Sequence, residues 1–340
     1  MNDFQDIKAL VRDYYQALDS ATADTVGQVM DAYTSGRYHW YGVHPWGEQD
    51  SAAGVAETFW KPFLGAWSRV QRRQDIFLAG TSEIDGTDWT ISMGHFMGLL
   101  DATWLGIPAT RKIAFLRYAD FNCIENGKIC RTGFFCDIIA VMQQAGINPL
   151  PPQTGASFVY PGPRTHDGLL YEPQDAAESN KTLRLVNSMI ADLSQLNCTG
   201  DDCPPPDLLA RTWHDDMIWY GPAGIGATYT IPRYQEQHQY PFRTGLKNKG
   251  FNGHVCRLAE GKYAGFFGWP NLTNTPVGGF LGLPGGDIPA DMRVVDIYRR
   301  EGDKLAENWV LIDLPHWLKM QGLDILERTR KIVNGQGECQ

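Results

Sequence analysis

The spacing of hydrophobic and polar positions changes along the chain, and the same order of spacings occurs twice. Apolar residues recur every three or four positions from Phe4 to Leu18, which predicts an amphipathic helix. From residue 74 onwards they fall into short alternating runs, which predict antiparallel strands near 74–78, 89–99, 112–124 and 129–136. Asn126-Gly127, between the last two runs, is typical of a β-hairpin turn.

A proline-rich segment separates the two occurrences. Helical spacing restarts at 179–196, and short motifs then repeat. Trp40-Tyr41-Gly42 matches Trp219-Tyr220-Gly221 at an offset of 179 residues, and Asp137 matches Asp313 at an offset of 176. These offsets predict a tandem duplication of one α+β domain. The predicted boundaries are domain 1 at 1–148, a linker at 149–175, domain 2 at 176–330 and a tail at 331–340.

Composition narrows the class of protein. The 340 residues carry a formal net charge of −9, so the chain lacks the basic surface that nucleic acid or an anionic membrane requires. We expect no transmembrane helix and, because the start of the chain is acidic, no signal peptide, which predicts a cytoplasmic protein. The seven cysteines form no CxxC pair, so reduced thiols are expected. Whether Cys198 and Cys203 ever pair is left open.

Each half ends its last predicted strand on an aspartate, Asp137 or Asp313. Alternation along a strand places Trp309 and Asp313 on one face, so the carboxylate would lie at the tip of an apolar row, where its pKa rises. The other interpretation is that the aspartate caps the helix that follows. A two-residue turn at Asn126-Gly127 would also place Asp120 on the face of Asp137, about 13 Å away along the strand. The second half predicts the same for Asp296 and Asp313.

An ordered set of motifs in the second half resembles a known family. WHDDMIWYGPAGIG, YPF, GLPGG and RVVDIYRREGDKLAENWVLID follow one another. This set is similar to the SnoaL-like polyketide cyclases (ester cyclases) of the nuclear transport factor 2-like (NTF2-like) superfamily, over most of 179–325 and more weakly over 6–147. The resemblance implies two cone-shaped α+β barrel domains, each a curved antiparallel sheet wrapped around helices, paired as an internal pseudo-dimer.

The resemblance also implies a chemistry. Its aspartate acid/base for aldol-type ring closure, carried onto this chain, is Asp313 and, by the duplication, Asp137. Gly133 stands where the family has tryptophan, whereas the second half keeps Trp309. Either one half is the working copy and the other structural, with the second half favoured, or each half takes a different ligand. The predicted function is a cyclase or isomerase that acts on a small apolar, polyketide-like carbonyl compound without cofactor or metal. The alternative is a non-catalytic protein of the same fold that binds or carries a small molecule.

A pocket is predicted in each half, and a small hydrophobic ligand is the expected partner. The expected lining residues are Trp219, Asp296, Trp269, Trp309 and His316 in the second half, and Trp40, His44, His95, Asp120 and Phe135 in the first. The eight histidines show no paired metal-ligand spacing. For His95, a place in the core is the alternative.

Overall fold

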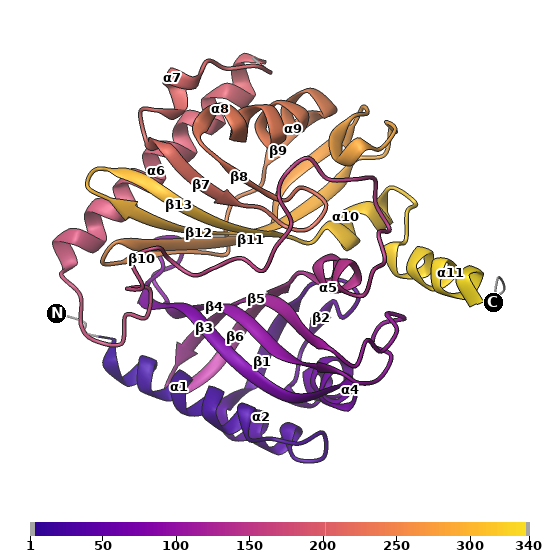
Figure 1. The fold of residues 1–340 in the computed structure, drawn as a ribbon. Helices are drawn as coiled ribbons and strands as arrows, with labels where there is room; N and C mark the ends of the chain where they lie inside the picture. Colours follow the sequence, from indigo (N-terminus) through magenta and orange to yellow (C-terminus); the bar gives the residue numbers. More distant parts are fainter. Residues whose placement is uncertain (1–3, 201, 338–340) are drawn as a thin grey trace. The chain divides into compact units, whose positions relative to one another are not determined.

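The computed structural model describes residues 4–200 and 202–337, with only the backbone of residues 198, 336 and 337. The Cys198 side chain is not among those described, so whether Cys198 and Cys203 pair lies outside the described residues. The chain forms two compact units (Figure 1). The N-terminal unit comprises residues 4–149, 164–173 and 323–337, and the C-terminal unit comprises residues 150–163 and 174–322.

The N-terminal unit packs helices on a six-stranded sheet of order β2-β1-β6-β5-β4-β3. Its elements are α1 (Gln5–Asp19), α2 (Val26–Tyr33), β1 (Thr34–Gly42), β2 (Glu48–Gln49), α3 (Ala52–Val55), η1 (Ala56–Trp60), α4 (Lys61–Ala66), β3 (Trp67–Thr81), β4 (Asp88–Leu100), β5 (Ile113–Glu125), β6 (Lys128–Cys136), α5 (Ile138–Gln144) and α11 (Ile325–Gly337). The predicted apolar stripe of α1 is buried at Val11, Tyr14 and Leu18, and the neighbouring Tyr15 is buried as well. Hydrophobic burial therefore fixes the helix on the sheet.

The C-terminal unit repeats this scheme on a sheet of order β10-β11-β12-β13-β7-β8, with β9 also paired to β11. Its elements are α6 (Ala176–Thr199), α7 (Pro206–Leu209), β7 (Trp213–Tyr220), β8 (Ala227–Tyr229), α8 (Ile231–Tyr234), η2 (Gln235–Gln239), α9 (Tyr240–Gly245), β9 (Leu246–Phe251), β10 (Cys256–Glu260), β11 (Tyr263–Pro276), η3 (Phe280–Gly282), β12 (Ala290–Glu301), β13 (Lys304–Ile312) and α10 (Leu314–Met320).

The two sets of elements correspond almost residue for residue. The segments α3, η1 and α4 recur as α8, η2 and α9 at an offset of 179, and β6 and α5 recur as β13 and α10 at an offset of 176. The predicted tandem α+β architecture is thus confirmed. Each sheet is mixed where an antiparallel sheet was predicted, because β1 lies parallel to β6 and β7 lies parallel to β13.

One prediction about register is wrong. A β-bulge in the β5–β6 hairpin shifts the pairing between Cys123 and Ile124, so that Asp120 lies opposite Phe134 and not opposite Gly133. The β12–β13 hairpin has the same irregularity, and Asp296 lies opposite Val310. A one-residue shift moves every later side chain to the other face of the sheet. Asp120 and Asp296 therefore lie on the face of their sheet opposite to the one predicted for them together with Asp137 and Asp313.

The proline-rich segment is divided between the units. Residues 150–163 belong to the C-terminal unit, where the Gly155 N–H donates to the Ile225 carbonyl at 2.9 Å. Residues 164–173 pair with β3 of the N-terminal unit, where the Phe77 N–H donates to the Gly168 carbonyl at 2.8 Å. Helix α11 also packs in the N-terminal unit, with Thr329 Oγ1 3.3 Å from the sulfur of Met142.

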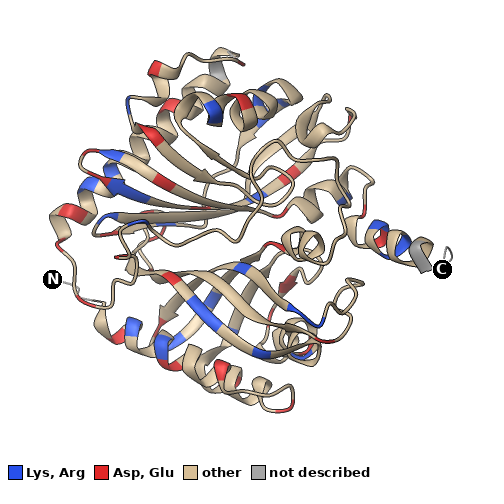
Figure 2. Ribbon diagram, in the orientation of Figure 1, with Lys and Arg blue, Asp and Glu red and all other residues tan. Residues whose placement is uncertain are grey.

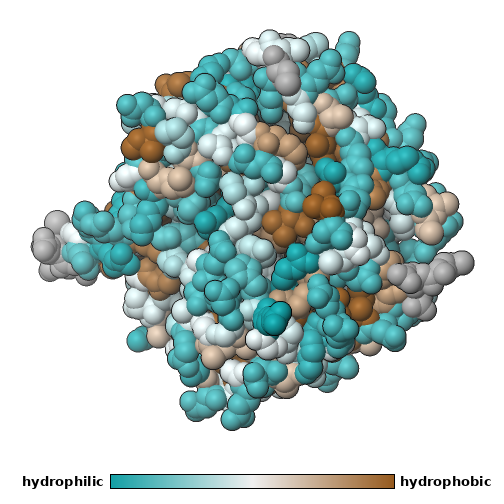
Figure 3. Space-filling view, turned by 180° about the vertical axis from the view of Figure 1, so that it is seen from behind, coloured by the Kyte–Doolittle hydropathy of each residue, from teal (hydrophilic) through white to brown (hydrophobic). Residues whose placement is uncertain are grey.

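The surface carries both signs of charge. Figure 2 shows Lys and Arg interspersed with Asp and Glu along the elements of each unit. On the face drawn in Figure 3, hydrophobic side chains form small separate areas among hydrophilic ones. Within residues 4–200 and 202–337, no helix combines the length and the apolar character needed to span a bilayer.

Candidate functional site in the C-terminal unit

The C-terminal unit has a partly open cavity of about 230 Å³ between its sheet and the helices α6, η2 and α9. Most of its wall is apolar or aromatic. These members are Met189, Ile190, Leu193, Leu209, Trp213, Trp219, Tyr234, Phe242, Phe251, Phe266, Leu272, Met292, Val294, Tyr298, Val310 and Ile312. The polar members are Ser194, Asn197, His238, Gln239, Arg243, His254, Asn271, Asp296 and Asn308. Such a wall suits a small apolar ligand held by a few polar groups.

Asp296 is the carboxylate of this cavity. It lies in β12, and the register after the bulge places it on the face of Asn308 and Val310. The Asn308 amide donates to Asp296 Oδ1 at 3.2 Å, and the Tyr298 side chain also hydrogen-bonds to the carboxylate. Burial raises the pKa of Asp296 to about 6, although both hydrogen bonds act in the opposite direction. Asp296 is half-buried as a residue and lines the cavity.

Two histidines lie flat against aromatic rings of the same wall. His238 stacks on Trp219 with ring centroids 4.1 Å apart, and His254 stacks on Phe266 at 4.0 Å. Burial lowers the pKa of each imidazole to about 3, with the Arg257 charge adding to the effect at His254. Both rings are therefore neutral at pH 7 and offer hydrogen bonds without charge.

Two polar atoms of the wall lack partners among the described residues. His238 Nδ1 and Gln239 Nε2 are buried and make no hydrogen bond there. Gln239 Oε1 accepts from Gln235 Nε2 at 3.1 Å, which fixes the amide so that its NH₂ is the unpaired end. Leaving buried polar atoms unpaired costs about 1–3 kcal/mol each. A ligand that bonds to them would recover this free energy.

An interruption in the sheet marks the rim of the cavity. The N-terminal unit has one continuous strand, β3, where the C-terminal unit has β9 and β10 separated by residues 252–255. Gly253 within the gap has φ +107°, a conformation that favours glycine. Phe251 and His254 flank it and line the cavity, and Phe251 is 51% exposed. Phe251 therefore reaches from solvent to the interior.

The N-terminal unit carries a carboxylate and a guanidinium at the corresponding positions. Asp120, the counterpart of Asp296, accepts from the Tyr15 hydroxyl at 3.0 Å, and burial raises its pKa to about 6. Arg72, which is offset by 179 residues from Phe251, is buried with its guanidinium 4.1 Å from the centre of the Tyr15 ring. The same guanidinium lies 4.7 Å from the Phe96 ring. The Arg72 charge acts on Asp120 and lowers its pKa, against the larger effect of burial.

Asp313 and Asp137 cap helices. Asp313 Oδ1 accepts from the His316 N–H at 3.2 Å, and Asp137 Oδ1 accepts from the Ala140 N–H at 2.9 Å. Asp313 Oδ2 also lies 3.4 Å from a nitrogen of Arg293. Both side chains are buried, but neither is among the residues that line the described cavity. The geometry is that of the capping interpretation.

Of the other predicted lining residues in the second half, only Trp219 lies at the cavity with Asp296. Trp309 is on the opposite face of β13, where it stacks on Tyr220 and donates through Nε1 to the Pro161 carbonyl at 3.0 Å. Trp269 packs under Arg293, whose guanidinium carbon is 4.0 Å from the ring centre. His316 follows Asp313 in the helical cap.

The predicted residues of the first half lie in the N-terminal unit, and none of them lines the cavity described above. Trp40 stacks on Phe134, and Phe135 is fully buried. His95 Nδ1 lies 3.5 Å from Asp75 in the core, and burial lowers its pKa. His44 is half-buried before a cis proline. Five further residues of the wall were not predicted from the sequence, namely Tyr234, His238, Gln239, Tyr298 and Asn308. Alternation from Asp296 would have found Tyr298 and Asn308 if the bulge had been placed at Ala306.

Comparisons with known proteins give similarity over the length of one domain. A candidate SnoaL-like polyketide cyclase from Jannaschia sp. CCS1 is 14% identical, with a TM-score of 0.33, over 44% of this chain and 95% of its own. A candidate polyketide cyclase from Xanthomonas campestris pv. campestris is 17% identical, with a TM-score of 0.34, over 43% and 99%. An NTF2-like protein from Burkholderia thailandensis E264 is 20% identical, with a TM-score of 0.29, over 41% and 95%. No family model and no curated protein matches the chain.

Proposed function

We propose that the C-terminal unit is an acid/base enzyme that moves a proton at the carbon next to a carbonyl of a small, flat, apolar compound. Asp296 would be the base. The observation that carries this proposal is a carboxylate with a pKa of about 6 in the wall of an aromatic cavity. A base whose pKa lies near neutrality is largely ionised at pH 7 and still strong enough to accept a proton. Cyclase or isomerase chemistry begins with such a step.

The surrounding groups have separable roles in this scheme. Asn308 and Tyr298 hold the carboxylate in one orientation by hydrogen bonds. The unpaired Gln239 NH₂ is suited to donate to the carbonyl oxygen as it gains negative charge. The neutral His238 ring is suited to bond a ligand hydroxyl or carbonyl without adding charge.

The dimensions of the cavity limit the substrate. A cavity of about 150 Å³ accommodates benzene, so the 230 Å³ of this cavity favours a compound of one to two rings. The only guanidinium in the wall described here, Arg243, donates to Asn197 Oδ1 at 3.1 Å and to the Leu196 carbonyl at 2.8 Å. Because its charge is already directed at α6, a neutral ligand is favoured over a carboxylate.

The test is exchange of the protons next to the carbonyl of 2-tetralone in D₂O, followed by proton NMR. Wild-type protein is expected to accelerate exchange, with a rate that rises as pH passes through about 6. Asp296→Asn is expected to lose about 10²- to 10⁴-fold. Asp313→Asn and Asp137→Asn, which keep a residue that can cap a helix, are the matched controls and should retain exchange.

Two outcomes would contradict the proposal. Full exchange by Asp296→Asn would remove the carboxylate from the mechanism. Binding of 2-tetralone without exchange, with an affinity that stays flat between about pH 4 and 9, would favour the binding or carrier protein. Such binding is measurable by the fluorescence of Trp219, which lies in the wall.

A further inference from the structure

The β5–β6 hairpin of the N-terminal unit holds two cysteines at its bulge. Cys123 pairs with Arg131, and Ile124 pairs with Ile129, so Cys130 is the extra residue of the bulged strand. At a bulge two residues of one strand oppose a single residue of the other. Both Cys130 and Arg131 therefore reach Cys123: Cys130 Sγ lies 3.5 Å from the Cys123 carbonyl oxygen, and Arg131 Nη2 lies 3.3 Å from Cys123 Sγ.

A third ligand-type atom lies beside the two sulfurs. Cys123 Sγ, Cys130 Sγ and a carboxylate oxygen of Glu125 all lie within 4.8 Å of one another. Cys123 is buried, Cys130 is half-buried and Glu125 is exposed. The cluster thus runs from the core to the surface, and solvent reaches its Glu125 side.

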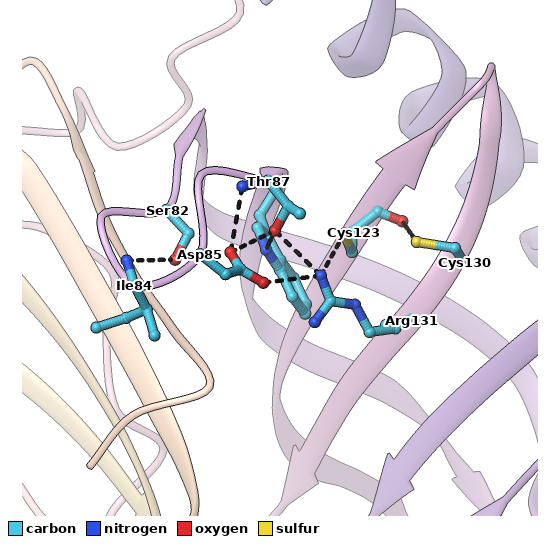
Figure 4. Close-up of polar contacts among 8 residues, drawn as sticks. Ser82, Ile84, Asp85, Thr87, Cys123, Cys130 and Arg131 are labelled. Atoms are coloured by element: carbon cyan, nitrogen blue, oxygen red, sulfur yellow. Dashed lines mark hydrogen bonds and ion pairs between the residues drawn. The ribbon is translucent and has the colours of Figure 1, made fainter.

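The Arg131 guanidinium lies where it would stabilise negative charge on the Cys123 sulfur (Figure 4). Its Nη2 bonds not only to Cys123 Sγ but also to Asp85 Oδ2 at 3.0 Å and to Thr87 Oγ1 at 3.1 Å. The guanidinium is therefore held by other acceptors and remains in position as a hydrogen-bond donor to a thiolate. Hydrogen bonds of this kind to the sulfur of a metal ligand are usual in the shell around a metal site.

The C-terminal unit carries different side chains at the same bulge. The counterparts of Cys123, Glu125, Cys130 and Arg131, at an offset of 176, are Arg299, Glu301, Ala306 and Glu307. There Arg299 is the cation, bound by Glu301 at 2.8 Å and by Glu307. The second repeat thus supplies its own positive group between two carboxylates, whereas the first repeat places two thiols and a carboxylate together.

We propose that Cys123, Cys130 and Glu125 bind a thiophilic divalent cation of the Zn²⁺ class, with a fourth position open to solvent. Two thiolates select such cations over Mg²⁺ or Ca²⁺. Bonds of about 2.3 Å to sulfur in a tetrahedral site bring two sulfurs to about 3.8 Å from each other. Side-chain rotation suffices to reach this from ligand atoms already within 4.8 Å. Three protein ligands and an open position are typical of zinc sites that keep a bound water.

The experiment titrates the reduced, chelator-treated full chain with Cd²⁺, whose thiolate charge-transfer band reports sulfur ligation, and then displaces Cd²⁺ with Zn²⁺. One equivalent is expected to bind. Cys123→Ser and Cys130→Ser should each weaken binding more than about 100-fold, since loss of a ligand costs more than the 10- to 100-fold of an outer-shell change. Glu125→Gln, an exposed change that leaves the core intact, should weaken it about 10-fold or more. Cys203→Ser, at an exposed cysteine far along the sequence, is the matched control and should bind as wild type.

Two kinds of result would refute the cation site. Absence of a charge-transfer band at one equivalent, or a band that survives in Cys123→Ser, would refute the site. Formation of a Cys123–Cys130 disulfide in the chelator-treated protein, with no cation bound after reduction, would show a redox pair instead. Circular dichroism of each variant separates lost ligation from lost folding, and Glu125→Gln decides the matter if either serine variant unfolds.

Discussion

Replacing Asp296 by asparagine is expected to stabilise the protein at neutral pH while it removes the proposed base. A carboxylate in this wall is ionised at pH 7 at a cost in folding free energy, because burial raises its pKa from 3.8 to about 6. Asparagine keeps the shape and a hydrogen-bonding oxygen for the Asn308 amide but carries no charge. Stability gained at the expense of activity is common at functional sites.

The size of the effect follows from the pKa. A rise from 3.8 to about 6 corresponds to about 3 kcal/mol of free energy of unfolding. Asparagine returns less than this maximum because it loses part of the bonding to Asn308 and Tyr298, so the expected gain at pH 7 is about 1–3 kcal/mol. The sign is set by the raised pKa. Wild type is penalised fully above about pH 6, and the penalty disappears as pH falls below the unfolded value of 3.8.

The assay is urea denaturation of wild type and Asp296→Asn at several pH values from about 4 to 8. The difference in unfolding free energy should be small at pH 4, grow through pH 5 to 6 and level off above. Asp303→Asn, an exposed change in the β12–β13 turn, should alter stability by less than about 0.5 kcal/mol throughout. A difference between Asp296→Asn and wild type that stays constant over this range would refute the raised pKa.

Three further predictions concern the Asp313 helix cap, the cavity wall at Trp219 and the buried Arg72 side chain. Asp313→Ala should cost about 1 kcal/mol by removing the α10 cap, measured by denaturation, and should leave the pH profile of exchange unchanged. Gly221→Ala should cost about 1–3 kcal/mol and weaken 2-tetralone binding, since the added Cβ would meet the Trp219 ring at 2.0 Å. Arg72→Met should destabilise the protein by about 3–5 kcal/mol and raise the pKa of Asp120 above about 6, measured by carbon NMR titration.

Each of these has a contrary result. A shifted pH profile in Asp313→Ala would return Asp313 to the chemistry. Unchanged binding by Gly221→Ala would show that Trp219 is not part of the ligand wall. A fall in the pKa of Asp120 after Arg72→Met would contradict the assigned effect of the guanidinium, which lowers that pKa in the wild type.

The duplication and the order of elements could be predicted from the sequence because they rest on periodicity and on motifs repeated at fixed offsets. The face on which each carboxylate lies could not. One extra residue in each hairpin, Cys130 or Ala306, exchanges the faces of the strand that follows. The sequence therefore predicted Asp296 on the face of Trp309 and Asp313, whereas Asp296 lies on the other face, toward the cavity.

The contacts of Arg72 were also outside the reach of the sequence. Arg72 of β3 stands where the C-terminal unit has Phe251 of β9. Neither residue is unusual in a strand, and only the structure shows that the Arg72 guanidinium packs on Tyr15 and Phe96.

The place of helix α11 in the chain affects the order in which the N-terminal unit can fold during synthesis. Residues 323–337 complete the N-terminal unit after the whole C-terminal unit has been translated. On a ribosome, the first unit must wait for the last helix before Met142 gains its neighbour Thr329 and before the Arg330 side chain covers Gly106. Cleavage within the proline-rich segment would therefore not release two self-sufficient halves, and a fragment ending at residue 148 would lack its final packing layer.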